Sequence, residues 1–108
     1  MADARMSPEL VELIAARFKA LGEPARLRIL QALRSGEKTV SDLMRDTDLS
    51  QANTSRHLQL LHGLGFVDRR KEGLYVLYRL ADESVTHLCD VMCGRLEQQL
   101  DADRELFS

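Results

Sequence analysis

The sequence predicts a mainly helical domain that carries one β-hairpin. Apolar residues recur at helical spacing in four segments before residue 63 and in a fifth after residue 82. Two runs of strand character, residues 66–70 and 74–80, flank the polar turn Lys71-Glu72-Gly73. Aromatic residues make up 5% of the chain and Trp is absent, so aliphatic side chains that favour helices must form the core. The length of 108 residues suits one domain, which we expect to cover residues 1–108.

The first two helices have clear sequence boundaries. Ser7 is a good N-cap and Pro8 suits a first helical position, so we expect the first helix to begin there and to end at Gly22. The second helix is expected from Glu23-Pro24 to Ser35, because Gly36 is a stop signal. The apolar stripes of these two helices are Leu10, Leu13, Ile14, Phe18 and Leu21, and then Leu27, Ile29, Leu30 and Leu33.

A short helix, a tight turn and a longer helix come next. Thr39 or Ser41 caps the short helix, and Thr47-Asp48-Leu49 forms the connection. Ser50 caps a fourth helix over about residues 51–62, which Gly63 and Gly65 end. After the hairpin, Asp82 caps a last helix over about residues 83–106, whose apolar stripe is Val85, Leu88, Met92, Leu96 and Leu100. This order of elements predicts a winged helix-turn-helix, in which the hairpin is the wing.

Charge is distributed unevenly along the chain. The net charge is −2, which is unusual for a protein that binds nucleic acid. Residues 50–80 nevertheless carry five basic and two acidic side chains, a net charge of +3, whereas residues 81–108 have a net charge of −5. A basic middle segment beside an acidic tail fits a small DNA-contacting surface that points away from the acidic element.

The fourth helix has the composition of a DNA recognition helix. Small and polar residues let a helix backbone sit deep in the major groove, and long polar side chains present hydrogen-bonding groups to base edges. Leu58 and Leu61 are expected to anchor the opposite face. The predicted DNA-contacting residues of this helix are Ser50, Gln51, Asn53, Thr54, Ser55, Arg56 and His57, with Arg56 suited to guanine and the amides suited to adenine.

Residues 49–80, LSQANTSRHLQLLHGLGFVDRRKEGLYVLYRL, resemble the ArsR/SmtB family of winged-helix repressors. Residues 19–33, KALGEPARLRILQAL, resemble the segment that precedes this motif in the family. The resemblance implies a repressor that binds double-stranded operator DNA. We expect a homodimer, because the first and last helices carry apolar stripes that one small domain cannot fully bury, and two-fold symmetry matches a palindromic operator. The resemblance also places a His at position 57, which either reaches a phosphate or bonds a backbone carbonyl inside the domain.

The hairpin supplies a second group of candidate DNA contacts. Arg69, Arg70 and Lys71 are expected at its tip, where three adjacent cations suit phosphate contacts or entry into the minor groove. Tyr75 and Tyr78 are expected to pack against neighbouring strand residues rather than to stack on bases.

The two cysteines are the candidate effector site. Members of the resembled family respond to metal ions, metalloids or thiol oxidation, but this chain has no Cys in its second or third helix, where two of the family's sites lie. Its last helix carries His87 and Asp90 without the full His/Glu set of a third arrangement. Cys89 and Cys93 are four residues apart and share a helix face. Three roles remain open for these thiols: they bind a soft metal or metalloid ion, they oxidise together, or they only pack. The expected cofactor is accordingly a soft metal or metalloid ion, or none.

Other functional classes have less support from the sequence. There is no Gly-rich phosphate loop or nucleophile elbow, so no enzymatic activity is expected. No apolar run approaches the length of a membrane span, and the N-terminus has no signal-peptide pattern, which favours the cytoplasm. Two alternatives remain: a DNA-binding regulator without an inducer, and a winged-helix module that binds proteins.

Overall fold

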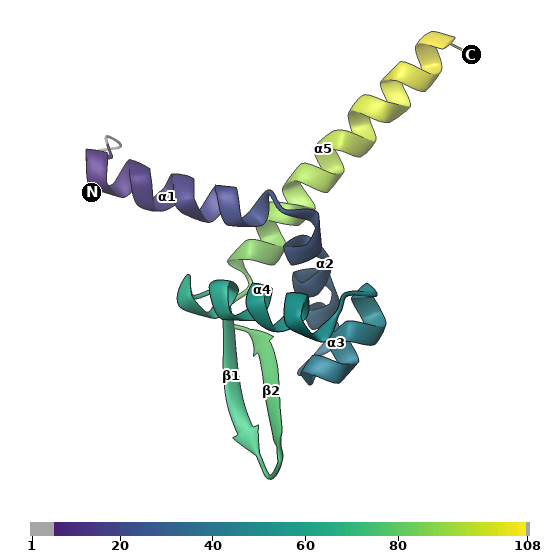
Figure 1. Cartoon of the computed structure of the whole chain (residues 1–108). Coiled ribbons are helices and arrows are strands. Elements are labelled where there is room, and N and C mark those ends of the chain that lie inside the picture. The colour runs from purple at the N-terminus through teal and green to yellow at the C-terminus, as the bar shows by residue number, and fades with distance from the viewer. Residues whose placement is uncertain (1–5, 108) are drawn as a thin grey trace.

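The computed structural model describes residues 6–107, with side chains as far as Arg104. Within these residues a helical body carries one antiparallel hairpin, as Figure 1 shows, so the predicted winged helix-turn-helix is confirmed. The elements are α1 Pro8–Leu21, α2 Pro24–Ala32, the short 3-10 helix η1 Leu33–Ser35, α3 Val40–Thr47, α4 Gln51–Gly63, β1 Val67–Glu72, β2 Tyr75–Leu80 and α5 Ser84–Phe107.

Local capping explains where most helices begin. The Ser7 hydroxyl accepts a hydrogen bond from the Leu10 amide at 3.1 Å, which confirms the predicted cap of α1. At α3, the Thr39 hydroxyl accepts from the Asp42 amide at 3.1 Å, and the Asp42 carboxylate accepts from the Thr39 amide at 3.0 Å. This reciprocal capping box selects Thr39 over Ser41. The second helix ends earlier than expected, because its last turn, Leu33–Ser35, tightens into η1.

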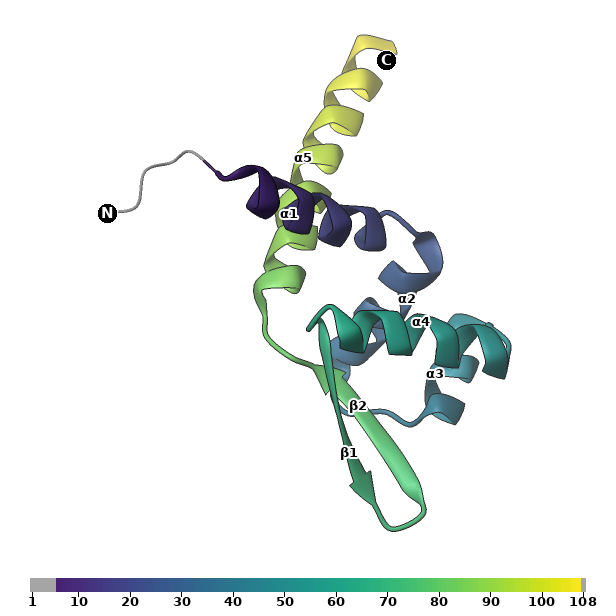
Figure 2. The ribbon, with the colours of Figure 1, turned by 60° about the vertical axis from the view of Figure 1, so that its left-hand side comes forward.

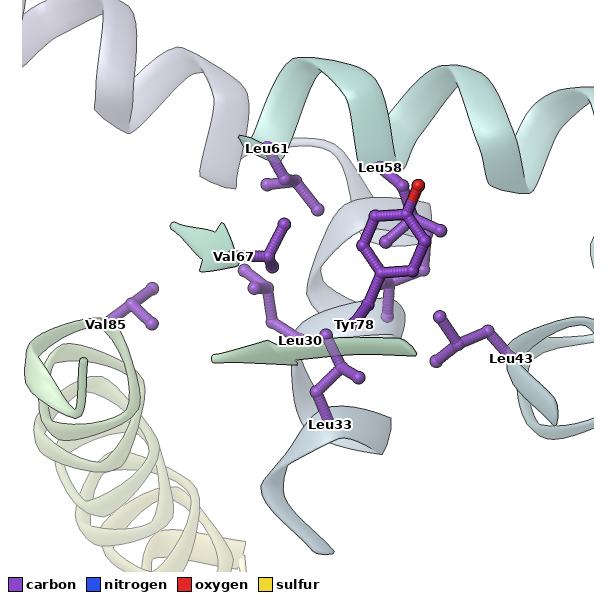
Figure 3. Packing of buried hydrophobic residues seen from close by; sticks show 9 residues of the cluster. Leu30, Leu33, Leu43, Leu58, Leu61, Val67, Tyr78 and Val85 are labelled. Carbon is purple, nitrogen blue, oxygen red and sulfur yellow. The ribbon is translucent and has the colours of Figure 1, made fainter. Parts of the chain in front are cut away.

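The core lies where α4 crosses α2, α3 and the base of the hairpin. Leu58 and Leu61 of α4 are fully buried, as are Ile29 of α2, Leu43 of α3 and Val67 of β1. Figure 3 shows Leu58 and Leu61 pointing from α4 toward Val67 and Tyr78 of the hairpin. Each fully buried aliphatic side chain contributes about 1.5–3 kcal/mol through removal of apolar surface from water. The core therefore fixes α4 by its inner face and leaves its outer face free.

The hairpin is more regular, and its turn is tighter, than the sequence predicts. The register pairs Val67 with Leu80 and Glu72 with Tyr75, so the turn consists of Gly73 and Leu74 alone. Gly73 has a φ of 61°, which glycine adopts without strain. Residues 69–71 therefore lie inside β1, and the prediction that they form the hairpin tip is wrong. The sequence ends the first strand at residue 70, because Lys71 and Glu72 are polar and the strands there extend beyond the core, where they have no hydrophobic partner.

Helices α1 and α5 extend away from this body, as Figures 1 and 2 show from two directions. Both helices carry large apolar side chains that the chain itself leaves exposed: Leu10, Val11, Leu13 and Phe18 on α1, and Leu88, Val91, Met92, Leu96 and Leu100 on α5. A hollow of about 650 Å³ lies between them. Near its start, α5 is tied to the body by Arg34 of η1, whose guanidinium donates to both carboxylate oxygens of Asp90, at 2.9 and 3.0 Å. Among the described residues, no helix has both the length and the apolar character of a membrane span.

Candidate nucleic-acid interface

Helix α4 has a polar, solvent-exposed face on the side opposite its buried Leu58 and Leu61. The Ser50 hydroxyl caps the helix by accepting from the Asn53 amide at 3.1 Å. Asp48, in the left-handed conformation with φ 58°, ends α3 and allows the chain to reverse into α4. Gln51, Asn53 and Arg56 are exposed, and Ser55 is half-buried. The two helices α3 and α4 thus form the predicted helix-turn-helix.

Two exposed side chains of α4 are already paired with one another. The Arg56 guanidinium donates to the Asn53 side-chain carbonyl at 2.9 Å. This bond between residues three apart holds the guanidinium against the helix and leaves its remaining N–H groups for an acceptor such as a guanine edge. Gln59 is also exposed and lies one turn beyond Arg56 on the same face. Sequence reasoning missed Gln59, although its spacing of three residues from Arg56 could have identified it.

Thr54 and His57 do not belong to the exposed face. Thr54 is fully buried, and its hydroxyl donates to the Ser50 carbonyl at 2.8 Å. His57 is also buried, and its Nδ1 accepts from Arg26 Nε at 3.3 Å, while Arg26 Nη1 donates to the Ala20 carbonyl at 3.2 Å. Their burial in the single chain argues against a place for these two residues among the DNA contacts. Inside the domain, Nδ1 of His57 accepts from a side chain, that of Arg26, rather than bonding the predicted backbone carbonyl.

Burial and charge act together on His57. Burial lowers the pKa of its imidazole, and the nearby Arg26 and Arg56 guanidinium groups lower it further, against a small opposing effect of Glu23. The neutral imidazole is also the form that can accept the Arg26 hydrogen bond. His57 thus connects α4 to α2 and, through Arg26, to the end of α1.

The cations of β1 lie on two opposite faces of the wing. Side chains alternate along a strand, so Arg69 and Lys71 share a face with buried Val67, which packs beneath α4. Arg70 lies on the opposite face, where it forms ion pairs with Glu37 at 2.8 Å and with Glu72 at 3.1 Å. Among the described residues neither Arg69 nor Lys71 forms an ion pair, and both are exposed. The wing cations that face the same side as α4 are therefore Arg69 and Lys71.

The side chain of Tyr78 packs as predicted, whereas that of Tyr75 does not. Tyr78 is buried beneath α4, while Tyr75 is 66% exposed beside the turn. Leu74, at the turn itself, is 100% exposed. The tip of the wing is therefore apolar, and the cations stand behind it along β1.

Cys89 and Cys93 lie on α5 beside the hollow between α1 and α5. Cys89 is half-buried and Cys93 is exposed, and both are free thiols. The Cys93 thiol donates to a Glu97 carboxylate oxygen at 3.5 Å, and this carboxylate raises the pKa of the Cys93 thiol. Within the described part of the chain, no three His, Cys, Asp or Glu side chains come together as a metal site, so one chain does not complete a centre around these thiols.

Comparisons with known proteins identify the family. Residues 23–69 match the model of the arsR family of bacterial regulatory proteins. The biofilm growth-associated repressor of Agrobacterium fabrum is 34% identical over 79 residues, which cover 73% of this chain and 68% of the relative. The chain belongs to the ArsR family. The comparisons thus confirm the family that the sequence resembles, which is a family of regulatory proteins rather than of enzymes.

Other ArsR relatives and solved structures agree in sequence and shape. A probable mercury resistance operon repressor of Streptomyces lividans is 36% identical over 78 residues, and the match spans 72% of this chain but only 61% of that repressor. The crystal structure of Mycobacterium tuberculosis Rv0081 superposes with a TM-score of 0.80 at 32% identity and covers 91% of this chain and 98% of that one. The homodimeric winged helix-turn-helix DNA-binding domain of Mycobacterium bovis Mb0332 superposes with a TM-score of 0.78 at 31% identity, covering 93% and 95%.

Proposed function

We propose that this chain is a transcriptional repressor that binds palindromic operator DNA as a homodimer. The observation that carries the proposal is the position of two polar surfaces on one side of the fold. The exposed face of α4 offers Gln51, Asn53 and Arg56, and the wing face beside it offers Arg69 and Lys71. A recognition helix with amide and guanidinium groups suits base edges, whereas cations on a wing suit phosphates.

The two surfaces contact different parts of the DNA. Ser50 and Ser55 are small enough to let α4 approach the major groove closely, and Ser50 lies at the helix N-terminus, where amide groups favour a phosphate. Arg56, aligned by Asn53, reads a base edge. Arg69 and Lys71 contact the backbone and supply affinity that depends on salt but not on sequence.

The apolar faces of α1 and α5 support the homodimer. Phe18, Met92 and Leu96 are each at least half-exposed in the single chain and border the hollow between the two helices. Contiguous exposed apolar surface of this kind marks an interaction site. The Mycobacterium bovis domain of similar fold is described as homodimeric, and a two-fold dimer matches a palindromic DNA site.

DNA binding is tested with a duplex that the wild-type protein selects from a random library. Fluorescence anisotropy then compares this duplex with a scrambled duplex of equal length. We expect tighter binding to the selected sequence and a strong decrease of affinity with salt. A protein that enriches no sequence, and binds both duplexes equally weakly, would instead favour the protein-interaction module.

Arg56→Ala tests the reading of bases. The variant is expected to lose about 1–3 kcal/mol of binding free energy on the selected duplex and much less on the scrambled one, because it removes a contact to a base edge. Arg28→Ala removes an exposed arginine of α2 outside both proposed DNA-contacting surfaces; it serves as the matched control and is expected to bind like the wild type. Equal losses on the two duplexes would make Arg56 a phosphate contact.

The cysteines of α5 bear on whether the repressor responds to an effector. Cys89 and Cys93 are the two cysteines of the chain, so any input through thiols acts at these residues. A carboxylate beside Cys93 opposes its ionisation, and the thiolate is the form that binds soft ions or reacts with oxidants. This favours a regulator whose DNA binding does not respond to mild oxidation at neutral pH.

A further inference from the structure

The outer face of the wing carries a connected group of charges that base reading does not use. Asp68, Arg70 and Glu72 alternate with the residues that face α4, so they share the outer face of β1. Asp68 pairs with Arg79 of β2 at 3.6 Å, and Arg70 pairs with Glu72 at 3.1 Å. Each cation on this face thus has an acidic partner, in contrast to Arg69 and Lys71.

Arg70 also reaches beyond the hairpin. Its Nε and Nη2 donate to the two carboxylate oxygens of Glu37, at 2.8 and 2.9 Å. Glu37 lies in the connection between η1 and α3, 33 residues away in sequence. The arrangement is bidentate, which fixes the relative orientation of the two groups better than a single contact does.

The backbone shows that this ion pair crosses a strand. Next to Glu37, the Lys38 amide donates to the Tyr78 carbonyl at 2.9 Å, and the Tyr78 amide donates to the Lys38 carbonyl at 2.8 Å. Lys38 therefore lies along one edge of β2, while β1 pairs with the other edge. Arg70 spans β2 from β1 to reach Glu37 and closes a clamp over the outer face of the sheet.

We propose that Arg70 is a positioning residue of the wing, and that its ion pair with Glu37 holds the wing at the angle that places Arg69 and Lys71 beside α4. The proposal rests on the proposed function for its DNA readout. It assigns Arg70 a different role from the phosphate contact that the sequence favours. A clamp of this kind acts by pre-organising the wing, because a strand pair extending beyond the core is otherwise free to bend at its base.

The pair is half-exposed, with side-chain exposures of 49% for Arg70 and 32% for Glu37, so it contributes little to folding stability. Its effect is expected in DNA affinity instead. Ordering one or two mobile side chains or segments on binding costs enough to weaken affinity by roughly 2- to 10-fold. Because the clamp touches no phosphate, its loss leaves the salt dependence of binding unchanged.

The test uses Glu37→Gln, Arg70→Gln and the double variant on the duplex selected by the wild type. We expect all three to weaken binding by the same factor, with the wild-type slope of affinity against salt. Lys71→Gln is the matched control, which is expected to lower that slope by about one unit. The clamp is overturned if Arg70→Gln also lowers the slope, if Glu37→Gln tightens binding, or if neither variant changes affinity.

Hydrogen exchange tests the clamp without DNA. We expect Glu37→Gln to speed exchange of the amides of β1 and β2 in the free protein, with exchange in α2 and α4 unchanged. Unchanged exchange in the hairpin would contradict the clamp even if the variant bound DNA less well. A wild type that selects no duplex would remove the proposed function, and the exchange measurement would still decide whether Glu37 restrains the wing.

Discussion

At the scale of single residues, the type of a side chain predicts which groups it can bind better than it predicts whether the residue is exposed or buried. Arg56 and Asn53 are exposed on α4 as expected, and their mutual bond was foreseeable from a spacing of three residues. Thr54 and His57 have equally polar side chains but are buried. Thr54 lies four residues before Leu58, and His57 lies four residues before Leu61, so both share the inner face of α4 with these leucines. That spacing could have placed them inside, but their polar side chains favoured the exposed face.

His57 gives a pH prediction at this scale. Its pKa is lowered in the fold, so the unfolded chain takes up the proton first as pH falls below the ordinary value of 6.5. The stability associated with neutral His57 is complete above that value and is lost as pH decreases toward the lowered pKa. We expect the free energy of unfolding, measured by urea denaturation, to decrease between about pH 7 and pH 5.

His57→Asn provides the comparison, because its side-chain carbonyl can accept from Arg26 without titrating. The variant is expected to be less stable at pH 7 but to lose less of its stability on acidification. A variant and a wild type with parallel pH profiles would show that His57 does not contribute to the acid sensitivity. Carboxylates with lowered pKa values, such as Glu37 and Asp90, titrate at lower pH and do not account for a change in this window.

At the scale of elements, capping residues predicted helix starts well, and side-chain composition predicted both strands but misplaced the turn between them. Ser7, Thr39 and Ser50 each accept a hydrogen bond from the amide three residues on, as N-caps do. The strand β1 extends through Arg69, Arg70 and Lys71 because its backbone pairs with β2, whatever its side chains are. Backbone pairing beyond the core leaves no hydrophobic pattern, so the sequence could not reveal the true turn.

Thr39→Ala tests the start of the helix-turn-helix. It removes one half of the capping box at α3, and we expect it to destabilise the protein by about 0.5–2 kcal/mol. Ser41→Ala is the matched control, because Ser41 is exposed and lies two residues away within the same helix. Thermal or urea denaturation of both variants makes the comparison. An equal effect of the two substitutions would indicate that helix propensity, rather than the cap, governs this helix.

At the scale of the whole molecule, a single chain leaves its most apolar helices uncovered. Half of the surface of Leu96 is exposed, and Phe18 and Met92 are more exposed still. The sequence predicted both apolar stripes, because their helical spacing is regular. It could not show that α1 and α5 extend from the body, since that depends on how the helix-turn-helix packs against them.

Leu96→Glu tests the dimer interface. The wild type is expected to sediment as a dimer at micromolar concentration, and a carboxylate on the apolar face is expected to weaken association at least about tenfold, because an unpaired charge is costly to bury. The substitution leaves the core intact, as Leu96 lies outside it. Leu74→Glu, at the exposed wing tip, is the control and is expected to remain dimeric. A wild type that sediments as a monomer would contradict the interface.

The thiols of α5 test whether this dimer carries a signal to the DNA. Residues four apart on a helix have Cβ atoms about 5–6 Å apart, whereas a disulfide needs about 3.5–4.5 Å, so Cys89 and Cys93 cannot join while α5 stays regular. The Glu97 carboxylate raises the pKa of the Cys93 thiol and so opposes formation of the reactive thiolate. We therefore expect a mild oxidant at neutral pH to leave the protein–DNA complex intact, with Cys89→Ser/Cys93→Ser behaving like the wild type.

Arsenite, a probe for paired thiols, is titrated into the same complex in parallel. A coupled effector would lower DNA affinity by roughly 5- to 150-fold. Release of the duplex from the wild type alone would establish the cysteines as a sensor and contradict the constitutive behaviour expected here.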